Sequence, residues 1–180
     1  MVDQGTGRQQ DRRMLTGLFH DRESTESAYQ SLRDRGYTDD EINVMMSDKT
    51  RDKYYSHGDT ALEDNKALEG MGTGGAIGGA LGAIIGGIAA IGTNLVMPGL
   101  GLIVWGPVAA AFAGAGAGGL TGGLVGALIG WGIPEEHAKY YEEGIKNGGT
   151  VLGVTPRTDE DATYFENEWR NNYHGDHVYR

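Results

Sequence analysis

Both ends of the chain combine short apolar runs with apolar positions at helical spacing. Residues 14–20 and 42–46 are apolar runs that predict two β-strands. Between them, residues 22–35 carry apolar side chains that would line one side of an α-helix, namely Ala28, Tyr29 and Leu32. The first part of the chain therefore predicts a β-α-β unit.

Residues typical of helix ends bracket this predicted helix. Asp21 is a favoured N-cap residue, and Gly36 stands just past the helix end, where a left-handed backbone favours glycine. Thr38 is followed three residues later by Glu41, which has the form of a capping box. We therefore expect a single helical turn before the second strand.

The C-terminal part repeats this plan. Residues 150–155 predict a strand, residues 158–173 a helix, and residues 177–179 a short last strand. The helix would place four apolar residues on one side: Ala162, Phe165, Trp169 and Tyr173. Two β-α-β units in series predict a ferredoxin-like domain of the α+β class. Because neither half could be stable alone, we expect residues 14–48 and 150–180 to fold onto each other.

A glycine-rich block without any charged residue, 70–134, separates the two halves, and roughly one residue in three there is glycine. Glycines at every fourth position lie along one side of a helix and let another helix approach closely. Each glycine costs a helix about 0.8–1 kcal/mol relative to alanine, so these faces should be buried against helices. We predict helix packing for two rows: Gly74, Gly78, Gly82 and Gly86, then Gly114, Gly118, Gly122, Gly126 and Gly130.

The block is long enough for two helical arms. Residues 71–92 and 107–132 would each measure about 33–39 Å as helices, enough for a hydrocarbon layer of roughly 30 Å. Pro98 and Pro107, together with several glycines, break helix between the arms and allow a turn. We therefore predict that residues 70–132 form a glycine-zipper α-helical hairpin inserted into the domain.

If both flanks belong to one domain, the insertion leaves and returns on the same side of any membrane. The hairpin then crosses twice or not at all. The apolar tip, residues 95–105, argues against a plain two-span hairpin, because a tip in water is usually polar. A re-entrant hairpin and a hairpin buried in a protein oligomer remain open. The positive-inside tendency would keep both termini in the cytoplasm, since the basic residues nearest the block all lie outside it: Arg51, Lys53, Lys66, Lys139, Lys146 and Arg157.

The remaining segments connect these parts. Residues 1–13 are polar without an apolar core, which predicts a disordered tail rather than a signal peptide. Residues 49–69 are charged and predict a linker or a surface helix. Residues 133–149 predict a connecting helix that begins at Pro134.

The segment LTGLFHDRESTESAYQSLRDRGYTDDEINVMMSD, the glycine-rich middle and the strand VLGVTP together resemble the bacterial general stress protein 17M family. The resemblance covers residues 14–48 and 70–180, and GYTDDEINVMMSD is its most specific motif. It implies a small ferredoxin-like domain, a glycine-rich insertion and stress-linked expression. It implies no established biochemical activity and no catalytic residues.

Composition narrows the possible partners. The net charge of −10 argues against nucleic acid, which is bound by basic surfaces. The chain has no cysteine, which excludes disulfides and thiolate metal sites.

Few side chains suggest chemistry. His20 stands between a predicted strand and a helix cap, where ligands can bind, but no nucleophile or second base is near it in sequence. His174, Asp176 and His177 suggest a metal, although histidines near a polar C-terminus are usually surface residues. We therefore interpret His20 as part of a polar turn and the other three as surface residues.

Two further patterns have structural explanations. The acidic clusters 39–41 and 159–161 begin predicted helices, so we assign them to capping rather than to calcium. The pattern G-x-G-x-x-G at Gly70, Gly72 and Gly75 has neither a P-loop lysine nor the acid of a dinucleotide fold. We predict no cofactor, no metal, no small-molecule substrate and no enzymatic activity.

Two hypotheses for function follow. The first is a non-enzymatic stress-response protein, associated with the cytoplasmic membrane through self-associating glycine-zipper hairpins, with its α+β domain facing the cytoplasm. The alternative is a soluble cytoplasmic homo-oligomer with the hairpins packed in its interior. A ligand-binding or enzymatic role of the ferredoxin-like domain is a third, weaker possibility.

Overall fold

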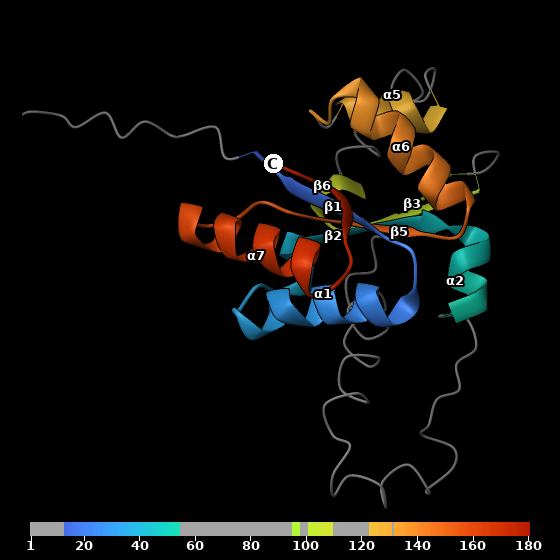
Figure 1. Cartoon of the computed structure of the whole chain (residues 1–180). Coiled ribbons are helices and arrows are strands. Elements are labelled where there is room, and N and C mark those ends of the chain that lie inside the picture. Colours follow the sequence, from blue (N-terminus) through green and yellow to red (C-terminus); the bar gives the residue numbers. More distant parts are fainter. Residues whose placement is uncertain (1–12, 55–94, 98–100, 110–122, 131) are drawn as a thin grey trace, which may run out of the picture.

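The protein, as a computed structural model, has a mixed α+β fold built around one antiparallel sheet (Figure 1). Its six strands lie in the order β3-β4-β2-β5-β1-β6. The structure describes residues 13–54, 95–97, 101–109, 123–130 and 132–180.

The described elements belong to the first half, to the glycine-rich block and to the C-terminal half. In chain order they are β1 (Leu15–Phe19), α1 (Arg22–Asp34), the 3-10 turn η1 (Asp39–Glu41), β2 (Ile42–Ser47), α2 (Asp48–Tyr54), β3 (Leu95–Met97), β4 (Leu102–Trp105), α5 (Gly123–Gly130), α6 (Glu135–Lys146), β5 (Thr150–Val154), α7 (Asp159–Asn171) and β6 (Asp176–Tyr179).

Strand β5 lies between the two strands of the first half. Leu15 of β1 is opposite Val154, and on the other side Ile42 of β2 is opposite the same residue. The two halves therefore fold onto each other, which confirms the expectation drawn from their incomplete strand sets.

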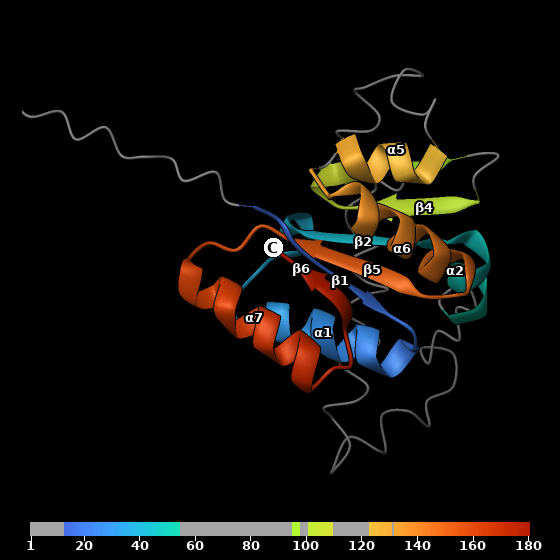
Figure 2. The same ribbon diagram turned by 45° about the horizontal axis from the view of Figure 1, so that its top comes forward.

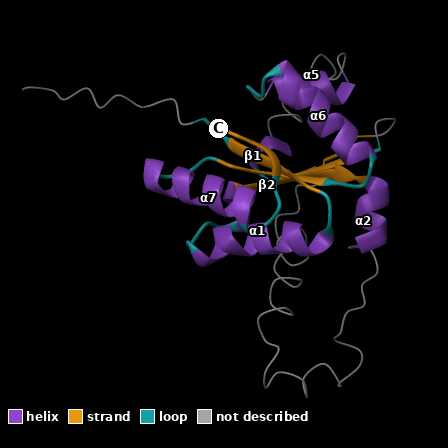
Figure 3. Cartoon of the chain, viewed as in Figure 1, coloured by secondary structure: helices purple, strands orange, loops and turns teal. Residues whose placement is uncertain are grey.

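Helices cover both faces of the sheet, with α1 and α7 on one face and α6 and α5 on the other (Figures 2 and 3). Met46 belongs to the core under α1 and α7, whereas its neighbour Met45 belongs to the core under α6 and α5. Because both faces are covered, consecutive residues of β2 are buried on opposite sides. This explains why the strand is a continuous apolar run rather than an alternating one.

The predicted helix ends are confirmed in the first half. The Asp21 side chain accepts a hydrogen bond from the Ser24 amide at 2.8 Å, and Gly36 has φ +82°. The Thr38 amide donates to the Glu41 carboxylate at 2.9 Å and closes the capping box. These local signals set where α1 ends and where β2 begins.

The structure differs from the sequence analysis in the middle of the glycine-rich block. The residues predicted to form the apolar tip of the helical hairpin instead form β3 and β4, which extend the sheet beside β2. All four side chains of β4 are buried, and Ile103 and Leu102 belong to opposite cores. Gly101, with φ +57°, forms part of the turn that precedes β4. Burial on two faces of a sheet therefore explains this apolar run.

A buried asparagine attaches the chain beyond β4 to the domain. Asn43 is 5% exposed; its Nδ2 donates to the carbonyl oxygen of Gly153, and its Oδ1 accepts a hydrogen bond from the Val108 amide at 3.0 Å. At Gly106, with φ +95°, a Cβ atom would lie 2.3 Å from the carbonyl oxygen of Ile42. Only glycine allows the backbone to approach this closely.

Much of the predicted insertion lies outside the described residues. The arm at 71–92 and most of the second arm fall there, as do the tail up to residue 12 and residues 55–69. Within the part that the structure describes, no helix has the length and the apolar character that crossing a membrane requires.

Replacing Gly106 by alanine should destabilise the domain by more than the roughly 1–2 kcal/mol that a left-handed backbone costs an L-residue, because the added methyl group collides with the backbone. Urea unfolding followed by tryptophan fluorescence measures the loss. Gly36→Ala is the matched control, since its φ is also positive but no described atom lies within 4 Å of the added Cβ. Equal losses in the two variants would show that the close contact at Gly106 is unimportant.

Candidate functional site

The structure describes only the end of the second predicted glycine row. Gly126 and Gly130 lie on α5, and a Cβ atom at either position would meet no described atom within 4 Å. The other predicted helix-packing glycines lie outside the described residues: Gly74, Gly78, Gly82, Gly86, Gly114, Gly118 and Gly122.

Helix α5 has two different sides. Leu124 and Leu128 are buried in the core beneath α5 and α6. The side that carries Gly126, Ile129 and Gly130 is open among the described residues, and the Ile129 side chain is 43% exposed. We call these three residues the glycine face of α5. It is an apolar, uncharged helix surface at the edge of the folded domain.

A glycine outside the predicted rows does make a very close packing contact. At Gly144 in α6, an added Cβ atom would lie 2.2 Å from a methyl carbon of Leu18 in β1. The missing side chain lets α6 lie close to the sheet. Spacing of four could not reveal this role, because the contact is to a strand far away in the sequence.

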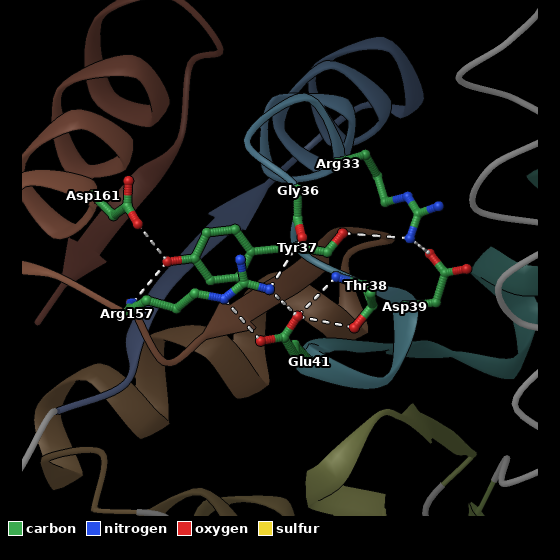
Figure 4. Close-up of polar contacts among 8 residues, drawn as sticks. All are labelled: Arg33, Gly36, Tyr37, Thr38, Asp39, Glu41, Arg157 and Asp161. Atoms are coloured by element: carbon green, nitrogen blue, oxygen red, sulfur yellow. Dashed lines mark hydrogen bonds and ion pairs between the residues drawn. The ribbon is translucent and has the colours of Figure 1, made fainter.

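A network of charged and aromatic residues joins the two halves at the ends of α1 and β5 (Figure 4). Tyr37 is 1% exposed; its hydroxyl donates to Asp161 at 2.8 Å and accepts from the Arg157 amide at 2.7 Å. The Arg157 guanidinium donates to both carboxylate oxygens of Glu41, at 3.1 and 2.6 Å, and to the Gly36 carbonyl oxygen. We call this set the junction network: Arg35, Gly36, Tyr37, Glu41, Arg157 and Asp161.

Two carboxylates of the junction network are held in the charged form. The hydrogen bond from Arg157, followed by that from the Thr38 amide, lowers the pKa of Glu41 to about 2. Burial raises the pKa of Asp161, but hydrogen bonds from Tyr37 and Arg35 outweigh burial, so that this pKa lies below its ordinary value. Burial also raises the pKa of Tyr37, which keeps its hydroxyl a donor.

Each acidic cluster contributes one residue to the junction network, Glu41 from the cluster at η1 and Asp161 from the cluster at α7. Helix capping also acts at the start of α7, where the Thr158 side chain accepts a hydrogen bond from the Asp161 amide at 3.0 Å. Asp161 also forms an ion pair with Arg35. The sequence analysis missed the roles of Tyr37 and Arg157, because their partners lie more than 100 residues away.

The structure brings together His20 and Asp176, which the sequence analysis considered separately. Nε2 of His20 lies 2.7 Å from Oδ2 of Asp176, and the two side chains are 50% and 51% exposed. The hydroxyl of Tyr140 donates to the same carboxylate oxygen at 3.4 Å. This contact links the end of β1 with α6 and the start of β6.

Aromatic rings of α6 and β6 meet beside this pair. The rings of Tyr140 and His177 stack with centroids 3.5 Å apart, and the ring of His137 lies 5.5 Å from that of His177 and 4.5 Å from that of Tyr179. Nδ1 of His137 is buried and has no hydrogen-bond partner. We call this set the histidine cluster: His20, His137, Tyr140, Asp176, His177 and Tyr179.

The histidine cluster does not have the arrangement of a metal centre. Among the described residues, no three histidine or carboxylate side chains are placed so that they could hold a metal ion. Two histidines nearby have a backbone that is uncommon outside glycine, with φ +52° at His174 and +46° at His177. The structure places His174 in the short segment between α7 and β6.

Comparison with protein-family models, with curated proteins and with solved structures finds no significant match to this chain.

Replacing Tyr37 by phenylalanine should lower the free energy of unfolding by about 1–3 kcal/mol, because two part-buried hydrogen bonds of its hydroxyl are lost. A double-mutant cycle with Asp161→Asn separates this contact from other effects of each change. Additive losses in chemical unfolding would mean that Tyr37 and Asp161 are not coupled.

Acid should weaken the junction network through Glu41. Its pKa is lower in the folded protein than the ordinary 4.5, so the stability it contributes is complete above that value and is lost as the pH falls towards 2. Glu41→Gln should flatten the dependence of unfolding free energy on pH in this range, leaving the slope due to other carboxylates such as Asp161. Arg157→Gln should flatten it similarly, and an unchanged slope in both variants would contradict this assignment.

Proposed function

We propose that this chain is a non-enzymatic stress-response protein that self-associates through glycine-zipper arms carried by a ferredoxin-like domain. The observation that supports it most directly is the open glycine face of α5, on a helix whose other side is firmly packed. The link with stress rests on the family resemblance of the sequence.

The arrangement of four strands supports the ferredoxin-like assignment. Strands β2, β5, β1 and β6 lie side by side in this order, all antiparallel, with α1 and α7 together on one face. Two consecutive β-α-β units give this order when the third strand inserts between the first two. Strands β3 and β4 and helices α5 and α6 would then be additions to that core.

The glycine face of α5 supports self-association for an energetic reason. Gly126, in the interior of α5, weakens the helix by about 0.8–1 kcal/mol relative to alanine, and no described contact offsets this loss. Close approach of another helix would offset it through backbone packing. Ile129 beside them would lose its exposure in the same contact.

The position of β4 favours shallow membrane contact over crossing. Because β4 pairs with β2, the block returns to the domain in its middle. The uncharged residues before β3, 70–94, would measure about 38 Å as a helix, whereas crossing and returning through a layer of roughly 30 Å needs about 60 Å. Residues 110–122 are fewer still. We therefore propose that the arms enter one leaflet at the cytoplasmic face of the membrane.

A soluble homo-oligomer with the arms in its interior is the second candidate. The same open glycine face supports it, because another copy of the chain could cover that face without lipid. Fractionation without detergent, followed by flotation with vesicles, separates the two. Protein that floats with vesicles supports the membrane form, and a large lipid-free particle supports the soluble form.

Replacing both Gly126 and Gly130 by leucine should abolish the assembly while leaving the domain folded. The added side chains would block close helix contact, whereas leucine is the better helix former by roughly 0.8 kcal/mol per position. Sedimentation velocity measures assembly, and circular dichroism with urea unfolding checks the fold.

Lys139→Leu is the matched control, because it places an apolar leucine at an exposed position of the neighbouring helix α6. It should leave the assembly unchanged. An oligomer of unchanged size in the double leucine variant would refute packing through the glycine face, and a monomeric wild-type protein would refute self-association altogether.

A further inference from the structure

The C-terminal strand β6 lies at one edge of the described sheet and pairs with β1 in an interrupted register. Its pairing with β1 joins Thr16 to Tyr179 and Leu18 to Asp176, with a shift of register between them. Val178 is the buried side chain of the strand, and its neighbour His177 has a left-handed backbone. Such an edge strand opens more readily than the central strands β5 and β1.

Contacts with α6 add to the pairing of β6 with β1 and to its packing against α7. The Tyr141 hydroxyl donates to the His177 carbonyl oxygen at 2.6 Å, and the Tyr140 ring stacks on the His177 ring. The His137 ring packs edge-on against that of His177 and tilted against that of Tyr179. Two ionisable imidazoles therefore face each other across the junction of α6 and β6.

We propose that the histidine cluster is an acid-sensitive latch, in which protonation of His137 beside His177 releases β6 from α6 and from the edge of the sheet. This device goes beyond the proposed assembly through α5 and uses different residues.

The surroundings of His137 disfavour its charged form. Burial and then the nearby His177 lower its pKa below 6.5, while Glu136 on the same helix acts in the opposite direction. Nδ1 of His137, which must carry a proton in the imidazolium form, has no acceptor. A proton added there is buried without a partner, and protonation of both rings would place two positive charges about 5.5 Å apart.

Other charged groups around the latch act on different contacts. Asp176 precedes His177 on β6, and its carboxylate is engaged by His20 from the end of β1. This contact holds the start of β6 beside the end of β1. From α7, the Arg170 guanidinium donates to the Val178 carbonyl oxygen independently of pH in this range. Both contacts must break before the latch opens, so their strength determines the pH at which β6 is released.

The sign of the effect follows from linkage. Because the pKa of His137 is lower in the closed state than the ordinary 6.5, opening becomes more favourable as the pH falls below 6.5. The opening constant should rise by at most about tenfold per pH unit until the lower pKa of the closed state is reached, and then level off.

Hydrogen exchange of the full-length protein between pH 7.5 and pH 5, corrected for intrinsic exchange rates, tests the latch. Amides of β6, and those of β1 that face it, should lose protection as the pH falls, while amides between β5 and β2 keep theirs. In His137→Phe, which keeps an aromatic ring but cannot be protonated at this position, protection of β6 should no longer fall as the pH falls.

A second variant guards against a general loss of packing. His20→Asn removes the ion pair with Asp176, so release of β6 should persist and begin at a higher pH. Equal pH dependence in wild type and His137→Phe would overturn the proposal. Full protection of β6 in the wild type down to pH 5 would also overturn it.

Discussion

The insertion of β5 between β1 and β2 is the constraint on which the rest of the structure depends. Val154 is opposite both Leu15 and Ile42, so neither half of the domain has a complete sheet by itself. The intervening chain must leave after β2 and return before β5. The entropic cost of closing so long a loop is moderate, because this cost grows only with the logarithm of the loop length. The junction network then fastens the two halves at one end, where Tyr37 and Arg157 exchange contacts across them.

The intervening chain is itself part of the domain. Strand β4 extends the sheet beside β2, and α5 and α6 cover the face that α1 and α7 leave uncovered. Glycine serves different purposes along it. Gly106 and Gly144 allow close approach to the backbone of β2 and to a side chain of β1, whereas Gly126 and Gly130 face open space among the described residues. Of these four glycines, the latter pair lies on the glycine face of α5.

The sequence was most informative where short-range signals act. Asp21 and Gly36 mark the ends of α1 because a cap and a left-handed residue satisfy groups within a few residues of themselves. The sequence was misleading at residues 95–105. An apolar run next to prolines and glycines there fits a hairpin tip and a pair of short strands equally well. Which of the two forms depends on a partner strand, and the hydrogen bonds that join strands are made by backbone groups common to all residues.

By itself the sequence determined the two β-α-β units, their caps and the spacing of the glycines, because each of these depends on residues that are close together along the chain. Only the tertiary structure decided that β4 joins β2, that His20 meets Asp176 across 156 residues, and which side of α5 is left open. Those arrangements follow from how the two covered faces of the sheet are filled. How side chains fill these two faces depends on residues far apart in the sequence, so no local sequence pattern predicts it.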